Sequence, residues 1–236
     1  MGLHECVIRH TAGTVDGVDG SFLAGLDDAA RAALGNLGRV RRFEAGTTLF
    51  LEGDVGASVM IVHTGHVKVF ATTPDGHERV LAIRGPGDVL GDLSAIDRQP
   101  RSASGTALEA SDVQIVAADG FRAFLADTPR AALVLLQVMI GRMRDSDRLR
   151  AEFGTVDTGR RVALRLVELA ETVGEPGAGG IRLTLPLTQD DLAGWISASR
   201  EAVARALASL RRRGLITTGR RAITIVDLPG LREATR

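Results

Sequence analysis

Two short polar segments in the first half of the chain have the side chains needed to hold a phosphorylated nucleoside. Gly91-Asp92-Leu93 comes first, and Arg101-Ser102 begins nine residues after Asp92. A glycine lets backbone N–H groups approach an anion, while arginine adds a positive charge and a fork of donors. The serine hydroxyl can join them, and the carboxylate can accept from sugar hydroxyls. The same pattern is also compatible with a surface turn that contains an arginine.

A second group of residues near the C-terminus predicts a helix-turn-helix. Thr188-Gln189-Asp190-Asp191 has the form of a capping box and starts a short helix. After the tight turn at Ser197-Ala198, Ser199 is placed to cap a second helix over 200–213, which Gly214 ends. Two short helices with so little chain between them form a helix-turn-helix. The second helix would pack inward through Val203, Ala206, Leu207 and Leu210.

The opposite face of that second helix has the residue types that read bases in a major groove. It presents Arg200, Glu201 and Arg205, with the small Ala204 and Ala208 beside them. Arginine can donate a bidentate pair to guanine, and a carboxylate can accept from the cytosine amino group. The alanines would let the helix lie deep in the groove. Taken alone, the same residues could instead form an ordinary ion-pair group on a helix surface.

The charge distribution favours the DNA-reading interpretation. The chain has no net charge, yet residues 1–158 hold 16 basic and 21 acidic groups, whereas residues 159–236 hold 13 and 8. The resulting net charge of +5 on the C-terminal third suits a module that binds a polyanion. Within this third, two short apolar strands flank a basic tip, so Arg220 and Arg221 would form a wing on DNA phosphates.

The segment from Arg42 to Ile115 must position the anion-binding residues, and its pattern is that of short strands. Alternating or apolar runs at 59–62, 67–70 and 79–83 are separated by turns rich in glycine and proline. Many short strands at even spacing predict an antiparallel barrel or roll. Helices are expected on either side of it, at 27–37 and 120–126.

A long helix should follow the roll, because Thr128-Pro129 is a favourable helix start and the apolar pattern runs to about Asp157. Alternating spacing of four and three predicts a coiled-coil dimer seam. Its positions are Ala132, Leu136, Met139, Met143, Ser146, Arg150 and Phe153. The alternative is an amphipathic helix packed on its own roll. Ser146 and Arg150 indicate that a seam here meets something polar midway.

Together these elements predict an α+β fold in four parts. Residues 1–20 would be a flexible tail, and 21–128 an antiparallel β-roll or barrel of the jelly-roll type that serves as a sensor domain. Residues 129–157 would form the dimerisation helix. Residues 158–236 would form a winged helix-turn-helix, with a helix at 160–172, a Gly-rich turn at 174–180 and a strand at 181–185.

Composition excludes several other classes of protein. The aromatic residues are seven Phe and one Trp with no Tyr, too few for nucleic-acid binding by base stacking. The single cysteine, Cys6, allows no internal disulfide, so a reducing cytoplasm is expected. The longest apolar run, 131–140, is too short to span a bilayer, and no signal peptide is evident. No Ser-His-Asp order, metal-ligand spacing or Walker loop is present, so we do not expect an enzyme.

Several glycine-centred turns and two polar motifs identify the chain by resemblance. They are Phe43-x-x-Gly46, Glu52-Gly53-Asp54, Gly65, Pro86-Gly87-Asp88, Gly91-Asp92-Leu93, Arg101-Ser102-Ala103 and Ser199-Arg200-Glu201-x-Val203-x-Arg205. Over residues 21–228 the chain resembles the cyclic-AMP receptor protein/FNR (CRP/FNR) superfamily of bacterial transcription regulators. The resemblance implies a homodimer that binds palindromic double-stranded DNA with TGTGA-like half-sites. It would contact DNA through Thr188, Gln189, Ser199, Arg200, Glu201, Arg205, Arg220 and Arg221.

The resemblance also implies cyclic AMP as the allosteric effector. Arg101 and Ser102 would hold the cyclic phosphate, and the backbone of Gly91 and Leu93 would add contacts. Asp92 would take the ribose 2′-hydroxyl. Two residues of the long helix would meet the base, with Ser146 at the adenine amino group and Asp147 reaching it from the partner subunit.

Three positions depart from the family's pattern. Asp92 is one methylene shorter than the usual glutamate, Asp147 replaces another polar residue, and Arg150 occupies a seam position that is typically apolar. Cofactors of other branches are not expected. The N-terminal cysteines of the iron–sulfur branch are missing, and for a haem or other metal the residues His63, His66 and His77 are isolated on strands at the surface.

Two alternatives stay open. One is a family member that binds DNA without cyclic AMP or with another small ligand, and the other is a ligand-binding module for protein partners. RNA polymerase would be a further partner if the protein activates transcription. No membrane partner is expected.

Overall fold

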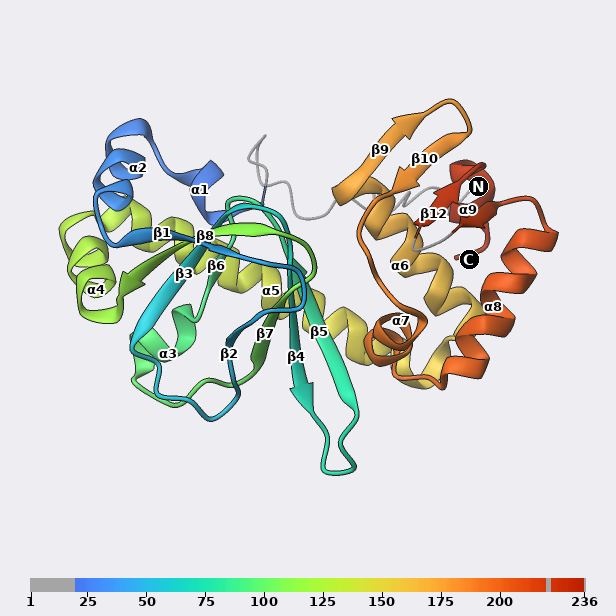
Figure 1. The fold of residues 1–236 in the computed structure, drawn as a ribbon, viewed down its shortest axis with the longest axis horizontal. Helices are drawn as coiled ribbons and strands as arrows, with labels where there is room; N and C mark the ends of the chain where they lie inside the picture. The colour runs from blue at the N-terminus through green and yellow to red at the C-terminus, as the bar shows by residue number, and fades with distance from the viewer. Residues whose placement is uncertain (1–19, 220–221, 236) are drawn as a thin grey trace, which may run out of the picture.

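The computed structural model describes residues 20–219 and 222–235, which form a β-roll domain, one long helix and a C-terminal domain (Figure 1). The α+β architecture with an antiparallel roll is confirmed. Two four-stranded sheets make the roll, in the orders β1-β8-β3-β6 and β2-β7-β4-β5. Their strands are β1 (Arg39–Phe43), β2 (Thr48–Phe50), β3 (Ser58–Thr64), β4 (Val67–Thr72), β5 (Glu78–Arg84), β6 (Val89–Leu90), β7 (Ser104–Ala107) and β8 (Ser111–Ala117).

Strand β3 shows why a continuous apolar run is needed at the centre of the roll. Val59 and Ile61 pack toward the helices that cover the sheet, whereas Met60 and Val62 pack into the interior of the roll. Successive side chains of a strand point to opposite faces, so a strand covered on both faces must be apolar throughout.

Four short helices accompany the roll, and the sequence predicted two of them. They are α1 (Phe22–Gly25), α2 (Asp28–Gly35), α3 (Asp92–Asp97) and α4 (Ala118–Asp127). Helix α2 begins one residue later than expected because Asp27 is its N-cap, accepting from the backbone N–H of Ala30. Helices α1 and α3 are too short to produce a periodic pattern and were not expected.

Helix α5 (Pro129–Thr155) runs behind the roll toward the C-terminal domain (Figure 1). It packs on the β-roll domain through Ala131, Val134 and Leu135, which are buried. Among the described residues no single helix is long and apolar enough to cross a membrane. The pair α4 and α5 meets that requirement by length and composition, but its two helices are bent by 112°.

The dimer seam predicted on α5 stays a prediction, and one of its residues is partly covered within the chain. Met139 is half-buried and packs against the core of the β-roll domain. The large apolar side chains exposed on α5 are Leu133, Leu136, Ile140 and Met143. Heptad spacing alone cannot show which face of a helix its own domain occupies, and here the domain covers Met139. The side chain of Phe153 lies outside the described part of the chain.

The C-terminal domain has the predicted helix-turn-helix with a small antiparallel sheet of order β11-β12-β10-β9. Its elements are α6 (Thr158–Val173), β9 (Gly174–Gly177), β10 (Gly180–Leu183), α7 (Gln189–Ile196), α8 (Arg200–Arg212), β11 (Ile216–Gly219), β12 (Ala222–Ile225) and α9 (Leu228–Glu233). The expected turn at 174–180 is wrong in part, because four of its residues pair with β10 as strand β9. Backbone pairing with β10 compensates for the weak strand propensity of glycine.

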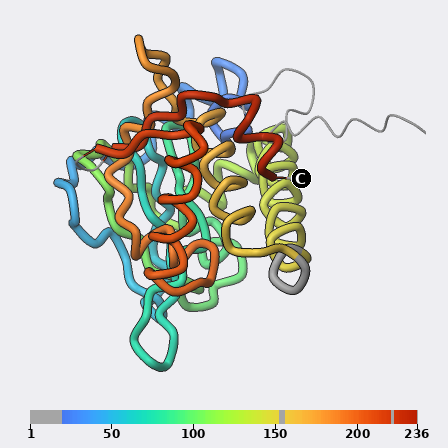
Figure 2. Tube along the Cα trace, turned by 90° about the vertical axis from the view of Figure 1, so that its right-hand side faces the viewer, coloured from blue at the N-terminus to red at the C-terminus, as the bar shows by residue number. Residues whose placement is uncertain are grey.

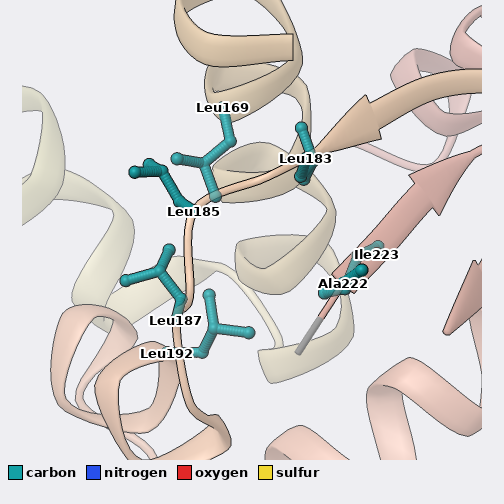
Figure 3. Close-up of a pocket in the computed structure, with 7 residues that line it drawn as sticks. All are labelled: Leu169, Leu183, Leu185, Leu187, Leu192, Ala222 and Ile223. Atoms are coloured by element: carbon teal, nitrogen blue, oxygen red, sulfur yellow. The ribbon is translucent and has the colours of Figure 1, made fainter. Parts of the chain in front are cut away.

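An apolar hollow lies inside the C-terminal domain (Figure 3). It is lined by Leu169, Leu183, Leu185, Leu187, Leu192, Ala222 and Ile223. None of these side chains can hydrogen-bond or carries charge, so the chemistry of this hollow does not suit a nucleotide.

The two domains are in direct contact through α7 and strand β5. Val80 of β5 is part of the buried core of the C-terminal domain, and Ile83 packs against the same core. Gly194 of α7 lies so close to the Glu78 backbone that an added Cβ would be 2.4 Å from its carbonyl oxygen. In Figure 2 the C-terminal domain accordingly lies over the roll, with the long helix to one side.

Candidate functional site

The two halves of the predicted anion-binding motif come together in the structure at Gly91. This residue follows β6 and adopts a positive φ of 73°, a conformation that glycine enters readily. A Cβ built on Gly91 would be 1.7 Å from Nη1 of Arg101. A glycine is therefore required here both for its backbone conformation and for the close approach of the arginine.

The Arg101 side chain is buried against backbone carbonyls. It is 5% exposed, and its Nη1 donates to Gly91 O at 3.0 Å and its Nη2 to Ser58 O at 2.6 Å. The guanidinium also lies over the ring of Phe50, 5.1 Å from the centroid. Burial lowers the pKa of Arg101, against the opposing charges of Asp54 and nearby Asp92.

Asp92 is also buried, at 4% exposure, and it is paired with an arginine that the sequence did not single out. Arg142 of α5 approaches the Asp92 carboxylate to 3.2 Å and donates to Val89 O at 2.8 Å. Nη1 makes the contact with Asp92, whereas Nη2 donates to Val89 O and is also 3.4 Å from Asp88. Arg142 lies one helical turn before Ser146, so the i, i+4 relation to a predicted site residue was the available signal.

Arg84 is a second cation of this region that the sequence did not single out. It pairs with Val67 across the β4–β5 ladder, and Val67 belongs to the core inside the roll. Directly opposed residues share a face of the sheet, so Arg84 also points to the inner face. Burial, and to a smaller extent the charge of Arg142, lower the pKa of Arg84 to about 10, against the opposing effect of the carboxylates of Asp88, Asp92 and Asp145.

The remaining residues predicted for the ligand lie on the surface or at its margin. Ser102 and Leu93 are exposed, and Ser146 is half-buried on α5. Asp147 is exposed, with its carboxylate 3.8 Å from Arg150 one turn further along the helix. Within one chain, Asp147 is therefore not part of the cluster around Asp92.

The expectation for the histidines was wrong in two cases. His66 lies between strands β3 and β4, and its side chain is largely buried with Nδ1 2.7 Å from Glu109. His77 is exposed, as expected, but it lies in the β4–β5 turn beside Asp75. His63 is on β3 and is hydrogen-bonded to Gln114. No group of three or more His, Cys, Asp or Glu residues in the described segments is arranged to hold a metal ion.

The predicted capping box of the first helix of the helix-turn-helix is confirmed. The Thr188 hydroxyl accepts from the backbone N–H of Asp191, and the Asp191 carboxylate accepts from the backbone N–H of Thr188 at 2.9 Å. Gln189, the first residue of α7, is exposed. Helix α8 begins at the expected residue as well, where the Ser199 hydroxyl accepts from Ala202 N–H at 3.2 Å.

Helix α8 has the two faces that were predicted from its sequence. The apolar side chains at 203, 206, 207 and 210 are buried. On the other face Arg200, Glu201 and Arg205 are exposed. The Glu201 carboxylate accepts hydrogen bonds from its own backbone N–H and from Ser199, and both lower its pKa. Arg200 is 3.7 Å from Asp190 of α7.

The predicted wing is present as the β11–β12 hairpin, in which Gly219 pairs with Ala222. Arg220 and Arg221, expected at its tip, lie outside the described residues.

Comparison with known families gives two matches along the chain. A cyclic nucleotide-binding domain matches residues 40–128, and a Crp-like helix-turn-helix domain matches residues 160–234. The first match covers the roll that holds Asp92 and Arg101, and the second covers α7 and α8.

Relatives with both parts are similar over most of their length. The chain is 35% identical to a CRP-like cAMP-activated global transcriptional regulator of Mycobacterium tuberculosis, over 90% of this chain and 95% of the relative. It is 29% identical to a cyclic AMP receptor protein of Thermus thermophilus, over 82% and 86%. A solved CRP-family regulator from Thermus thermophilus superposes with a TM-score of 0.72 at 26% identity, over 83% of this chain and 96% of that one.

Proposed function

The chain belongs to the CRP/FNR superfamily of DNA-binding transcription regulators, and from this premise we propose that cyclic AMP bound in the β-roll controls its binding to DNA. The family is not an enzymatic one, and the chain combines a cyclic nucleotide-binding domain with a helix-turn-helix. The M. tuberculosis relative is described as cAMP-activated, which supports cyclic AMP as the effector here.

The observation that carries the proposal is a pair of buried, oppositely charged side chains, Arg101 and Asp92, that both lie beside Gly91. An arginine suits a cyclic phosphate, and a carboxylate one residue after Gly91 suits a ribose hydroxyl. Ser102 would add its hydroxyl to the phosphate, and the backbone of Gly91 and Leu93 would add further contacts. Arg142 holds Asp92 toward α5, so the ribose would lie between the roll and the long helix.

The base would then lie near Ser146, one turn beyond Arg142 on α5. In a homodimer Asp147 would reach it from the partner subunit. The exposed apolar stripe of α5, at 133, 136, 140 and 143, supports such a dimer because it has the alternating spacing of a coiled-coil seam. A stripe of this kind on a protein surface is typical of a protein–protein contact.

For DNA we propose a palindromic site with TGTGA-like half-sites, one for each α8 of the dimer. Arg200, Glu201 and Arg205 would contact bases, and the other predicted contacts would come from Thr188, Gln189, Ser199, Arg220 and Arg221. Ligand binding would stabilise one arrangement of the long helices, placing the two α8 helices about 34 Å apart, one turn of duplex. We further propose a cytoplasmic protein whose contact with RNA polymerase follows if it activates transcription.

The test is calorimetric titration with cyclic AMP and cyclic GMP, combined with DNA-binding titrations with and without each nucleotide. Arg101→Gln should abolish the heat of cyclic AMP binding. Arg98→Gln is the matched control, because Arg98 is exposed on the same loop. Heat from wild type and from Arg98→Gln, with none from Arg101→Gln, supports the proposal. No heat from wild type together with unchanged DNA affinity contradicts it.

A second candidate is a regulator that binds DNA without cyclic AMP or with another small ligand. One observation favours it: the donors of Arg101 already bond to Ser58 and Gly91, and Asp92 is already paired with Arg142. DNA affinity that does not respond to either nucleotide would identify this candidate.

A further inference from the structure

The contact between the β-roll domain and the helix-turn-helix is built around Lys68, the only lysine in the chain. Its Nζ donates to Oδ1 of Asp191 at 2.6 Å and to Oε2 of Glu78 at 2.6 Å. The side chains of Lys68 and Asp191 are 12% and 10% exposed, whereas that of Glu78 is half exposed. The Lys68–Asp191 pair is therefore a buried ion pair that joins two domains.

Apolar side chains add to the contact between the two domains. Val80 and Ile83 of β5 pack into the core of the C-terminal domain, and Leu108 packs against the same core. Removing one partner of such a pair leaves the other charge buried without compensation, which is strongly unfavourable. The pair thus permits few other arrangements of the two domains.

Both groups remain charged in the interface. Burial alone would lower the pKa of Lys68, but hydrogen bonds and charges from Asp191 and Glu78 outweigh burial and raise that pKa. Burial alone would raise the pKa of Asp191, yet the bonds from Lys68 and Thr188 lower it.

Asp191 also belongs to the capping box that starts α7. Its carboxylate accepts from the backbone N–H of Thr188 at 2.9 Å and from the Thr188 hydroxyl at 2.6 Å. Lys68 therefore holds the first turn of the helix-turn-helix, and α7 in turn packs against α8. This docking leaves the base-reading residues of α8 exposed, so it is compatible with bound DNA.

On the other side, Lys68 is connected to the anion-binding motif by one strand pair. It lies opposite Thr106 in the β4–β7 ladder, and β7 begins three residues after Arg101. The path from the expected phosphate site to α7 thus runs through paired strands and through one ion pair.

We propose that Lys68 is a positioning residue for DNA binding: it holds α7, and through it α8, at one angle to the β-roll domain. In the dimer this sets the spacing of the two α8 helices, so the inference rests on the proposed dimer and palindromic site. Lys68 contacts no DNA in this role. Its loss changes where α8 is presented and leaves base reading by each α8 intact.

The experiment compares a palindromic duplex with a duplex that carries a single half-site. Lys68→Gln should weaken palindrome binding by about tenfold to 100-fold, since the gain from two linked contacts depends on their geometry. Its half-site affinity should change less than about twofold, because each α8 still reads its own bases. Lys68→Arg should restore most of the palindrome affinity. Glu78→Gln, which removes only the exposed partner, is the matched control.

Palindromes with one base pair added to or removed from the spacer sharpen the test. Wild type should discriminate against both, and Lys68→Gln should lose much of that discrimination. Equal losses on palindrome and half-site, or unchanged spacing preference, overturn the positioning role. If wild type binds the palindrome no more tightly than the half-site, the proposed binding of a palindrome by a dimer is overturned.

Docking can be tested separately in wild type, because Lys68 is the sole lysine. Reductive methylation of full-length protein, followed by peptide mass spectrometry, measures the reactivity of its amine. Lys68 should react at least about tenfold more slowly than the lysine of a short unstructured peptide, as expected for an amine held in a buried pair. Asp191→Asn, which retains a side chain able to cap α7, should raise that rate. Lys68 reacting as fast as the peptide in wild type overturns the docking contact.

Discussion

The proposed base-reading face of α8 and the proposed anion-binding motif of the roll both contain arginine, but the structure holds these arginines in opposite ways. Arg200 and Arg205 are exposed on one continuous helix whose other face is core. Arg101 is buried, and its donors are bonded to carbonyls of Ser58 and Gly91, which are distant in sequence. The reading face can meet DNA without rearranging its own domain.

In the roll, by contrast, the residues proposed to bind the ligand already have bonds to other groups. In the proposed site a phosphate at Arg101 would compete with carbonyls, and a ribose at Asp92 would share a carboxylate that Arg142 already holds. Binding of the proposed ligand would exchange existing bonds, and a rearrangement of this kind is what an allosteric site requires. Four substitutions test this contrast.

Gly91→Ala should have the largest effect, on the roll alone. The new Cβ would collide with Arg101 and would require a backbone with φ of 73°. We expect cyclic AMP affinity to fall by at least about 100-fold, because the arginine is displaced and the backbone strained. Calorimetry measures it. Gly76→Ala is the control, since Gly76 has a similar φ but open space around it. Normal affinity in Gly91→Ala would contradict the placement of the phosphate at Arg101.

Arg200→Ala tests the other side of the contrast. It should lower affinity for the preferred site by about tenfold to 100-fold and relax specificity at one base pair, since one bidentate contact provides about 1–3 kcal/mol. Binding-site selection on random duplexes measures the change. Arg212→Ala, exposed in the last turn of the same helix, should leave the selected sequence unaltered. An unchanged profile for Arg200→Ala would exclude Arg200 from base reading.

Arg142→Met should weaken cyclic AMP binding by about tenfold, because Asp92 would then be a buried charge without its partner and would no longer be oriented. Titration calorimetry provides the measurement, with Arg144→Met, an exposed position on the same helix, as control. Equal cyclic AMP affinities in the two variants would show that Arg142 does not orient Asp92 for binding of the ribose.

Arg84→Met should have the smallest effect and should be stabilising. A folded-state pKa below the ordinary value means that folding disfavours the charged form, chiefly through burial and then through Arg142. Replacing the cation should therefore raise the stability of the ligand-free protein by about 1 kcal/mol, or Tm by about 2–4 °C. Differential scanning calorimetry measures it, with Arg39→Met, an exposed position of β1, as control. A lower Tm in Arg84→Met would mean that the nearby carboxylates outweigh burial.

The same contrast explains what could be predicted from the sequence. The capping box at Thr188, the cap at Ser199 and the two faces of α8 depend on residues within a few positions of one another. Their types and spacing therefore predict the structure, and α8 ends within one residue of its expected end. The alternation that predicted the roll is equally local.

What could not be predicted depends on residues far apart in sequence. Arg142 reaches Asp92 across 50 residues, and Arg84 reaches the same cluster only because β4 and β5 are in a given register. Met139 fits a heptad seam, yet the roll packs against it, and no periodicity reveals which neighbour covers a helix face. The Gly-rich segment at 174 became strand β9 through pairing with β10.

Strand β4 carries a consequence for building chimaeric regulators. Val67 faces the interior of the roll, while its neighbour Lys68 faces the helix-turn-helix. Two adjacent residues thus contact different domains. Dividing the chain between α5 and α6 leaves Lys68 with the sensor, although its ion pair is with the C-terminal domain. To attach another sensor to this C-terminal domain, a designer must also transfer the residues of β4 and β5 that contact the domain, namely Lys68, Val80 and Ile83. The segment to exchange is therefore the C-terminal domain together with those residues of β4 and β5 that face it.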